Sequence, residues 1–541
     1  MNSYQTIHAA LQKLCAQKEC EPKFSLDQPE EGFHGDYATN IAFVLAKKSG
    51  ASPKETAEGL ILELSALLED VVEKIEVAGP GFINFFLKDD VRTDEAEGVA
   101  LSDIKNVGGK GKVIVEYTDP NPFKLFHIGH LVPNAIGEAI AGLYEAQGYD
   151  VTRVCYQGDV GMHVAKTIFA IINNFEDAPK DDASLRDKVS YLGRAYAFGN
   201  NALEEEGNKQ KIAEINKAIF ERSDQKITSL YDTGKKWSLD YFEFLYTKLG
   251  TKFDYYIFES EVGDEGVRIV NKYLGKVFRE SDGAIVFPGE DFGLHTRVFV
   301  NSQGLPTYEA KELGNTYKKD SLVPNAVQSV VVTAKEIDEY FKVIKVTLGQ
   351  IDKPLADKLL HVSHGMLRLP EGKMSSRTGN IIPAEELIDT VSERISARLE
   401  DMKVDEYEKT QLINDIAVGA IKFSILKSAP GKDMVFDFEK SLSFEGDSGP
   451  YLQYTHARLC ALLDKAASAG IDIESYAIVS PERELEQAII GYSSVLEKAF
   501  KELGPHHIIQ HLLLLTRSFN NLYGRIQIVD EQNRPMFQSG R

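Results

Sequence analysis

The segment between residues 113 and 155 constrains the fold of this chain more than any other feature. Residues 113–115 form a short apolar run that is typical of a buried parallel strand. A loop and the helical pattern HIGHLVPNAIGEAIAGLYEAQG follow, and a second strand-like run, VTRVC, ends at Cys155. Strand, helix and strand in this order form a βαβ unit, which predicts a doubly wound parallel sheet.

Other patterns flank this unit. Before it, GDYATNIAFVLAKK has helical spacing and residues 72–88 alternate like a hairpin around the turn at 79–81, which predicts a small α/β unit. Charged helices interrupt the sheet pattern at about 165–280, and strand-like runs resume at 284–287, 297–300 and 329–333. We therefore expect an α/β multidomain protein with domains at 1–100, 101–385 and 386–541, the second carrying the insertion at about 165–280.

The third of these domains is expected to be helical, because two apolar stripes follow Pro383 at helical spacing. The first stripe consists of Leu387, Ile388, Val391, Ile395 and Leu399. The second consists of Ile508, Leu512, Leu515, Phe519 and Leu522.

Composition excludes some classes of protein. The 541 residues include 61 Lys and Arg against 82 Asp and Glu, a formal charge of −21. This acidic total does not exclude a nucleic-acid partner, because a local basic patch can lie within an acidic chain. No apolar run reaches the roughly 18 residues of a membrane span, and the N-terminus has no apolar signal-peptide core. The four cysteines form no CxxC pair, so we expect reduced thiols in a cytoplasmic protein.

Two histidines at the start of the predicted helix are the first candidates for chemistry. His127 and His130 are close enough in sequence for their side chains to share one helix face. Unpaired N–H groups and the helix dipole favour an anion there, and Gly129 allows a flat ring to approach the backbone. Capping or packing is the alternative role for such a pair. Their position directly after a buried strand favours nucleotide phosphates.

Two other nucleotide-binding motifs are excluded. The glycines at 108, 109 and 111 precede the strand, whereas those of a dinucleotide fingerprint follow it. No Gly-Lys pair is followed by Ser or Thr, so the chain has no Walker A loop.

A second candidate is the segment GKMSSRTG at 372–379. Lys373 and Arg377 lie between glycines, with small hydroxyl side chains between them, which favours a mobile cationic loop. Such a loop, closing on a leaving pyrophosphate, would stabilise the transition state more than the ground state. An ordinary polar surface turn is the alternative.

Together these two segments resemble the HIGH and KMSKS signatures of class I aminoacyl-tRNA synthetases. Four longer stretches, VEYTDPNPFKLFHIGHL, GDVGMHVAK, LPTYEAKELG and DFEKSLSFEGDSGPYLQYTHAR, resemble arginyl-tRNA synthetases, and HGDYATNIAFVLAKK and VAGPGFINFF resemble the family's N-terminal domain. The resemblance implies a Rossmann-type catalytic domain and a ligase. Such a ligase would convert L-arginine and ATP to arginyl-adenylate and pass the arginyl group to the 3′-terminal adenosine of tRNA(Arg).

The resemblance also implies roles for the two signatures. The residues implied at the ATP site are His127, Gly129, His130, Lys373, Met374 and Ser375. The implied catalytic residues are Lys124, His127, His130, Lys373 and Arg377. Ser376 departs from the pattern, which has a second lysine there, and Lys124 matches a lysine before the HIGH box that takes its place in this family. Mg²⁺ should accompany ATP, and no dedicated protein metal site is implied.

Arginine recognition needs carboxylates that pair with a planar guanidinium. By resemblance, Glu116 is an acidic ligand of the arginine side chain, Asn121 holds the α-amino end and Tyr308 lines the pocket. Glu312 stands where the family commonly has Asp, so its charge is kept but its reach is longer. A glutamine usual near 333–336 has no counterpart here.

The resemblance implies that tRNA is bound by both ends of the chain, with the N-terminal domain at the tRNA elbow and the C-terminal domain at the anticodon. Tyr451, Tyr454 and Arg458 are candidates to contact nucleotides, and a packed helix face is the alternative for this segment. We expect a monomer with no membrane partner, and a C-terminus that stops one helix early.

Two other functions remain open. One is an HxGH-type nucleotidyltransferase that adenylates a small acid without tRNA, which the helical C-terminal domain argues against. The other is a non-catalytic tRNA-binding paralogue, which the intact His127, His130 and Lys373 argue against.

Overall fold

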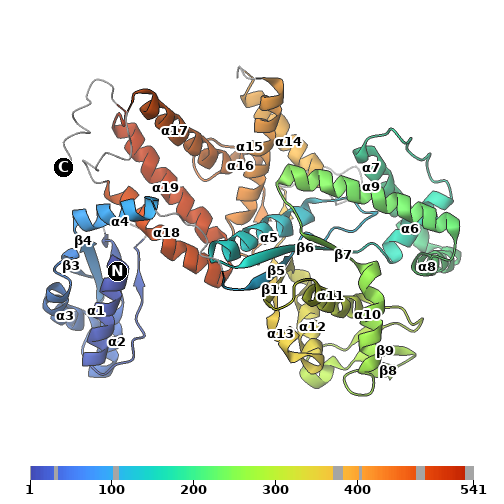
Figure 1. Cartoon of the computed structure of the whole chain (residues 1–541), viewed down its shortest axis with the longest axis horizontal. Helices are drawn as coiled ribbons and strands as arrows, with labels where there is room; N and C mark the ends of the chain where they lie inside the picture. Colours follow the sequence, from blue (N-terminus) through green and yellow to red (C-terminus); the bar gives the residue numbers. More distant parts are fainter. Residues whose placement is uncertain are drawn as a thin grey trace. The chain divides into compact units, whose positions relative to one another are not determined.

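The computed structural model describes residues 2–29, 34–101, 109–369, 382–400, 405–470 and 482–529, and Figure 1 labels most of its helices and many of its strands. The chain forms two compact units. The first unit combines Met1–Ile104, Leu452–Lys498 and His507–Arg541, and the second combines Lys105–Tyr451 and Ala499–His506.

The first unit contains a small antiparallel sheet, three helices that pack on it, and helices from both ends of the chain. Its elements are α1 (Ser3–Gln17), β1 (Leu26–Asp27), β2 (Tyr37–Thr39), α2 (Ile41–Ser49), α3 (Pro53–Leu67), β3 (Val72–Ala78), β4 (Phe82–Leu87), α4 (Asp89–Leu101), most of α17 (Gly449–Ser468) and α18 (Arg483–Glu502), and α19 (His506–Arg525). The sheet has the order β1-β2-β4-β3. The predicted hairpin is confirmed, because β3 and β4 pair antiparallel across the turn at 79–81.

The core of this sheet domain follows from the apolar spacing of its helices. The buried residues include Ile7, Leu11, Leu14, Ile41, Leu45, Leu60, Leu64, Ile83, Phe85 and Leu87. Residues i and i+4 of a helix share one face, and alternate residues of a strand share one side of the sheet. The predicted α/β character of this segment is therefore confirmed.

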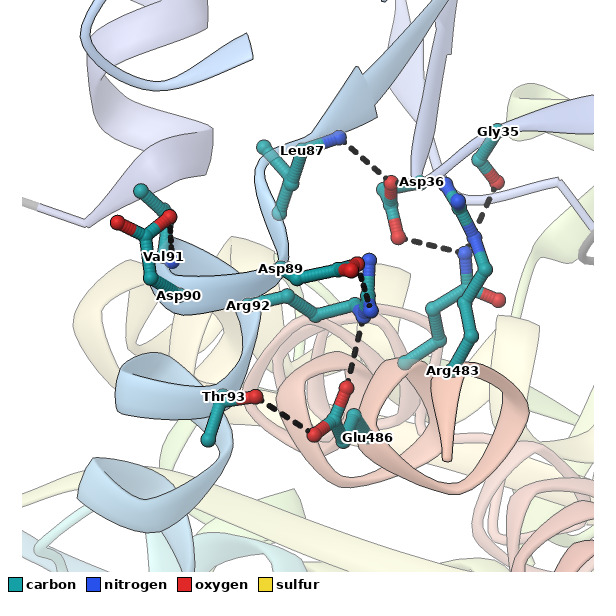
Figure 2. Close-up of polar contacts among 11 residues, drawn as sticks. Gly35, Asp36, Leu87, Asp89, Asp90, Val91, Arg92, Thr93, Arg483 and Glu486 are labelled. Atoms are coloured by element: carbon teal, nitrogen blue, oxygen red, sulfur yellow. Dashed lines mark hydrogen bonds and ion pairs between the residues drawn. The ribbon is translucent and has the colours of Figure 1, made fainter. Parts of the chain in front are cut away.

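A network of charged and polar side chains, with Arg92, Glu486 and Asp36 buried, joins α4 to α18 within the first unit (Figure 2). The Arg92 side chain is 2% exposed, and its Nε donates to Oε2 of Glu486 at 2.8 Å. A terminal nitrogen of Arg92 donates to Asp89 at 2.5 Å, and the Thr93 hydroxyl donates to Oε1 of Glu486 at 2.8 Å. Asp36 accepts hydrogen bonds from Arg483 at 2.5 Å and from the neighbouring Gln487 at 2.6 Å. Buried charges are costly unless paired, so these contacts fix how the two segments pack.

The second unit contains the predicted parallel sheet. The strands of this unit are β5 (Lys112–Glu116), β6 (Asp150–Gln157), β7 (Tyr255–Phe258), β8 (Arg279–Ser281), β9 (Ala284–Phe287), β10 (Arg297–Val300), β11 (Ala326–Ala334), β12 (Leu359–His364), β13 (Leu367–Arg368) and β14 (Met434–Val435). Its α-helices are α5 (Ile128–Ala146), α6 (Met162–Ile172), α7 (Leu185–Asn201), α8 (Glu206–Glu221), α9 (Gln225–Leu249), α10 (Glu259–Lys272), α11 (Tyr308–Leu322), α12 (Asp338–Ile351), α13 (Lys353–Lys358), α14 (Ala384–Arg398), α15 (Glu406–Leu426) and α16 (Phe438–Ser441). Short 3₁₀ turns are η2 (Ala202–Glu204), η3 (Gly289–Phe292) and η4 (Lys335–Ile337).

The central sheet has the order β12-β11-β5-β6-β7, and all its strand pairs are parallel. The predicted β5–α5–β6 unit is at its centre, so the α/β fold class and the doubly wound sheet are confirmed. The predicted strands at 284–287 and 297–300 exist, but they form a separate antiparallel sheet with β8.

The compact units divide the chain differently from the predicted domains. The predicted boundary at residue 385 lies within the second unit, because α14 and α15 bury apolar residues in the same core as α5. The predicted insertion at about 165–280 includes β7, a strand of the central sheet.

The two predicted helical stripes have different outcomes. In α14, Leu387, Ile388, Val391 and Ile395 are buried, as expected. In α19 the prediction is right for Phe519, which is buried, and wrong for Leu512, which is exposed while Ile509 and Leu513 are buried. Four consecutive leucines at 512–515 cover all sides of this helix, so periodicity alone does not identify its buried face.

Across the described part of the chain, no helix combines the length and the apolar character needed to cross a lipid bilayer.

Candidate active site

The site is built where strand β5 ends and the chain turns into helix α5. Parallel strands place their carboxyl ends at one edge of the sheet, where ligands of such folds usually bind. The connecting loop includes three non-glycine residues with positive φ: Thr118 at 80°, Asp119 at 44° and Phe123 at 67°. Such backbone is strained and is kept only where contacts hold it. Here the Asp119 carboxylate accepts from the Tyr156 N–H at 2.7 Å, and the Phe123 N–H donates to the Ser238 hydroxyl at 3.0 Å.

The two histidines cap helix α5 reciprocally. His127 is the residue before the helix, and its Nδ1 accepts the Gly129 N–H at 3.1 Å. Nδ1 of His130 accepts the His127 N–H at 3.1 Å, and the two rings stack with centroids 4.0 Å apart. The capping alternative from the sequence is therefore observed. No residue in the described part of the chain hydrogen-bonds Nε2 of either ring, so both Nε2 atoms are available for a ligand.

Both imidazoles are neutral near pH 7. Burial, with a contribution from the charge of Lys124, lowers the pKa of His127 to about 4. Burial also holds the pKa of His130 well below its ordinary value. A neutral imidazole whose Nδ1 accepts a hydrogen bond carries its proton on Nε2. Each ring therefore has an Nε2–H to donate to an anion, without a positive charge of its own.

The chain that follows the second predicted motif is hydrogen-bonded to this helix start. The Ile128 N–H donates to the Ile382 carbonyl at 3.0 Å, and the Ala384 N–H donates to the Phe126 carbonyl at 3.0 Å. The predicted residues of that motif, Lys373, Met374, Ser375, Ser376 and Arg377, lie outside the described residues.

A buried acidic cluster lies between the end of β5 and helix α11. Glu116 is 1% exposed, and its Oε2 is 2.7 Å from Nζ of Lys319 and 3.0 Å from the amide nitrogen of Asn315. The second predicted arginine ligand, Glu312, has its Oε1 3.8 Å from the same Nζ and 3.4 Å from the same amide nitrogen. The structure thus brings both carboxylates to one lysine.

The cluster holds more acid than its lysine can neutralise. Burial, opposed in part by Lys319 and increased by the charge of Glu116, raises the pKa of Glu312 to about 8. Burial and the charge of Glu116 also raise the pKa of Asp119. Burial opposes the charged form of Lys319, but Glu116 and Glu312 outweigh it and raise the lysine's pKa. A further cation would stabilise the ionised carboxylates.

The remaining predicted arginine contacts are Asn121, in the loop after β5, and Tyr308, at the start of α11. The Asn121 side chain packs over Gly158, where a Cβ atom would lie 2.2 Å from its Oδ1 and 3.2 Å from Oε1 of Glu259. Oε2 of Glu259 pairs with Nζ of Lys311 at 2.6 Å, and both side chains are buried. The same Nζ is 5.2 Å from the ring centroid of Tyr308, which is 64% exposed and open to a ligand.

Sequence reasoning missed Lys319, Asn315, Lys311 and Glu259. The spacing of residues on α11 carried a signal, because positions 308, 312, 315 and 319 follow one face of a helix. Positions 312, 315 and 319 are buried and all hold polar residues, which is unusual for a buried helix face. Glu259 begins α10, and no sequence pattern connects it to Lys311.

A fifth missed residue is Asp159, which anchors the surrounding helices and is fully buried. Its carboxylate accepts from the Tyr231 hydroxyl at 2.8 Å and pairs with Lys235 at 2.7 Å. It also accepts from the Ser260 N–H at 2.9 Å and from the Ser260 hydroxyl at 2.6 Å. Asp159 therefore fixes α9 and α10 at the end of β6.

The predicted tRNA contacts belong to different units, since Tyr451 is in the second and Tyr454 and Arg458 are in the first. The Arg458 guanidinium lies over Tyr454 at 4.7 Å and over Tyr523 of α19 at 4.6 Å. It also donates to Asn520 at 2.5 Å. Arg458 thus packs α17 on α19, whereas the Tyr454 ring is 48% exposed.

Comparison with protein families gives three matches in chain order. Residues 2–87 match the arginyl tRNA synthetase N terminal domain, residues 98–438 match tRNA synthetases class I (R), catalytic domain, and residues 452–539 match the DALR anticodon binding domain.

Individual relatives are similar over nearly the full chain. An arginine–tRNA ligase of Fusobacterium nucleatum is 29% identical over 540 residues, covering 96% of this chain and 91% of the relative. The Thermus thermophilus arginyl-tRNA synthetase structure has 25% identity and a TM-score of 0.76, covering 97% of this chain and 92% of the other. The Plasmodium falciparum arginyl-tRNA synthetase structure has the same fold, with 21% identity, a TM-score of 0.74 and coverage of 98% and 94%.

Proposed function

The chain belongs to the arginyl-tRNA synthetases, which are class I aminoacyl-tRNA synthetases, and on that premise we propose a role for each part of the site. The protein is an arginine–tRNA ligase that uses ATP to activate L-arginine and transfers the arginyl group to tRNA(Arg). The family, fold class and activity predicted from the sequence are confirmed.

We propose that the neutral histidines bind the phosphates of ATP. In the first step, a carboxylate oxygen of arginine attacks the α-phosphorus, and the bond from that phosphorus to the bridging oxygen breaks. The electron pair of that bond leaves with pyrophosphate. Nε2–H groups of His127 and His130 would donate to phosphate oxygens on which charge builds, which lowers the barrier chiefly by position and electrostatics. Lys373 and Arg377 are proposed to act on the pyrophosphate, as predicted from the sequence.

The observation that best supports the proposed arginine pocket is the buried acidic cluster beside this helix start. Glu116, Asp119 and Glu312 share one buried counter-ion, Lys319. A guanidinium is a planar cation with several N–H donors, so it would supply the missing positive charge and the missing hydrogen bonds. We propose that it enters between Glu312 and the exposed Tyr308 ring, while Asn121 holds the α-amino end.

Mg²⁺ is proposed to arrive with ATP. Among the residues that the structure describes, no group of three or more His, Cys, Asp or Glu side chains is placed to hold a metal ion. Phosphate oxygens and water are the usual ligands of nucleotide-bound Mg²⁺, and the ion would neutralise charge on the leaving pyrophosphate.

Recognition of tRNA is proposed to use both chain ends, with the N-terminal sheet domain at the elbow and the helices after residue 452 at the anticodon. Tyr451, Tyr454 and Arg458 remain proposed contacts. We also propose that the protein is cytoplasmic, because the four cysteines are free thiols and suit a reducing compartment. The proposal of a monomer follows from the family resemblance alone.

Arginine-dependent exchange of radiolabel between pyrophosphate and ATP tests the proposal when it is measured with and without tRNA(Arg). The family generally needs tRNA for activation, so we expect exchange only when tRNA is present. No exchange under either condition would refute the proposed site. Exchange that ignores tRNA would favour the alternative enzyme that adenylates a small acid.

A further inference from the structure

Two lysines near the helix start share one aromatic ring. Nζ of Lys124, in the loop before His127, lies 5.5 Å from the ring centroid of Tyr196. Nζ of Lys166, near the middle of α6, lies 5.9 Å from the same centroid and donates to the Asn200 side chain at 2.9 Å. A ring face attracts a nearby cation, so Tyr196 holds two positive charges close together.

Two glycines of α7 bring Tyr196 to this position. A Cβ atom at Gly199 would lie 2.0 Å from the Lys166 carbonyl oxygen, so only glycine lets α7 approach α6 at that point. A Cβ atom at Gly193 would lie 2.9 Å from Cγ of Leu125, the residue after Lys124. Tyr196 is midway between the two glycines, so the packing of α7 places its ring beside both lysines.

Neither ammonium group forms an ion pair with a carboxylate in the described part of the chain. Among the described residues, no carboxylate lies within 4 Å of either Nζ atom, whereas Lys311 and Lys319 have buried acidic partners. Burial and the charge of Lys166 lower the pKa of Lys124, and Glu259 offsets this only in part. Like charges held together in a partly buried place favour an anionic ligand.

We propose that Lys166 is a second phosphate-binding lysine of this enzyme, that it acts with Lys124 on the β- and γ-phosphates of ATP and on pyrophosphate, and that Tyr196 is a positioning residue for both. This inference rests on the ATP site proposed above. It addresses the departure at Ser376, where the family pattern has a lysine. Two fixed ammonium groups would stabilise the charge that moves to the bridging oxygen as the α–β bond breaks.

The test uses inhibitors that carry different parts of ATP. Wild type, Lys166→Met and Lys166→Arg are compared for the arginylation rate as ATP varies, and for inhibition constants of pyrophosphate and AMP. A lost charge-assisted contact costs roughly tenfold in affinity. We therefore expect Lys166→Met to raise the KM for ATP and the inhibition constant of pyrophosphate about tenfold, because the methionine lacks the charge. AMP inhibition and the KM for arginine should stay unchanged, and Lys166→Arg should recover most of the loss.

Lys217→Met is the matched control, because Lys217 is an exposed lysine of the neighbouring α8. It should behave as wild type. The inference is overturned if pyrophosphate inhibition is unchanged in Lys166→Met, or if AMP and pyrophosphate weaken equally, which would indicate general damage to the site. A change confined to the KM for tRNA would also overturn it and would assign Lys166 to a tRNA phosphate.

The positioning role of Tyr196 has its own variants. Tyr196→Phe keeps the ring and should retain pyrophosphate inhibition, whereas Tyr196→Leu should weaken it without changing AMP inhibition. Equal behaviour of the two variants would refute the role. Binding of pyrophosphate and AMP is measured in parallel by calorimetry. If the protein had no arginylation activity, the proposed function would be refuted, and the calorimetry would still test the role of Lys166 in pyrophosphate binding.

Discussion

The buried ion pair between Arg92 and Glu486 allows a quantitative prediction about the first unit. Arg92→Met removes the cation but keeps a long apolar side chain. Among the residues drawn in Figure 2, the Glu486 carboxylate, 5% exposed, would then keep only the Thr93 hydroxyl as a hydrogen-bond donor. Breaking a buried pair in this way leaves an uncompensated charge, which costs about 3 to 5 kcal/mol.

The double variant Arg92→Met/Glu486→Leu separates the charge effect from packing. With both charges replaced by apolar groups of similar length, no charge is left buried, and we expect much of the lost stability to return. Coupling between the two sites should then be about 2 to 3 kcal/mol, which is the upper part of the roughly 0.5 to 3 kcal/mol found for residues in direct contact.

The assay has to distinguish the two units. Trp237 is the only tryptophan of the chain and belongs to the second unit, so its fluorescence reports unfolding there. Native-state hydrogen exchange of peptides from β4 and α18 reports the free energy of opening in the first unit. Arg92→Met should accelerate exchange in both peptides and leave the urea midpoint of the fluorescence transition unchanged.

An exposed pair from the same unit provides the control. Lys18 and Glu63 lie 3.7 Å apart with side chains 44% and 39% exposed, so Lys18→Met should cost less than about 1 kcal/mol. If Arg92→Met is no more destabilising than Lys18→Met, the reasoning about this buried pair is wrong. It is also wrong if the double variant loses as much stability as the two single variants, Arg92→Met and Glu486→Leu, added together.

Three further predictions concern the active site. Arginine binding favours the ionised form of Glu312, whose pKa is raised to about 8, so the KM for arginine should fall by up to about tenfold per pH unit as pH rises from 6.5 to 8. This pH dependence should disappear in Glu312→Gln. A wild-type KM that does not change with pH would contradict the proposed arginine pocket. Glu116→Gln should raise the KM for arginine about 10- to 100-fold through loss of charged hydrogen bonds while the KM for ATP changes little, and equal effects on both would argue against the assignment. Both His127→Asn and His127→Ala remove the imidazole, so both should lose at least about a hundredfold in kcat. The asparagine can still cap the helix and the alanine cannot, so only the alanine variant should lose about 1 kcal/mol of stability in thermal unfolding. An active asparagine variant would limit the histidine to its capping role.

The sequence predicted the central fold because its local signals agree with its tertiary packing. The 113–115 run, the helix after His127 and the strand ending near Cys155 each have a period that matches their final element. The order of strands around β5 follows from the general rule for doubly wound sheets, so the position of His127 and His130 at the sheet edge was predictable.

The buried charges of the site were harder to predict. Glu116 and Lys319 are held together by the packing of α11 on β5, and the partner of a charged residue cannot be identified from periodicity. The same holds for Arg92 and Glu486, which are 394 positions apart in the sequence. Without that contact, the two ends of the chain appear in the sequence as independent domains.

This separation has a consequence for how the protein is made. A ribosome that adds about 5 to 20 residues per second needs roughly 20 to 80 s to travel from Arg92 to Glu486. During that interval residues 105–451, most of the second unit, are synthesised, while Arg92 on the nascent chain has Asp89 beside it but not Glu486. The first unit, which contains the N-terminus, is thus completed after the second unit. Substitutions in α18 should therefore act first on the yield of newly made protein, by leaving the early-made segment incomplete and available to chaperones and proteases.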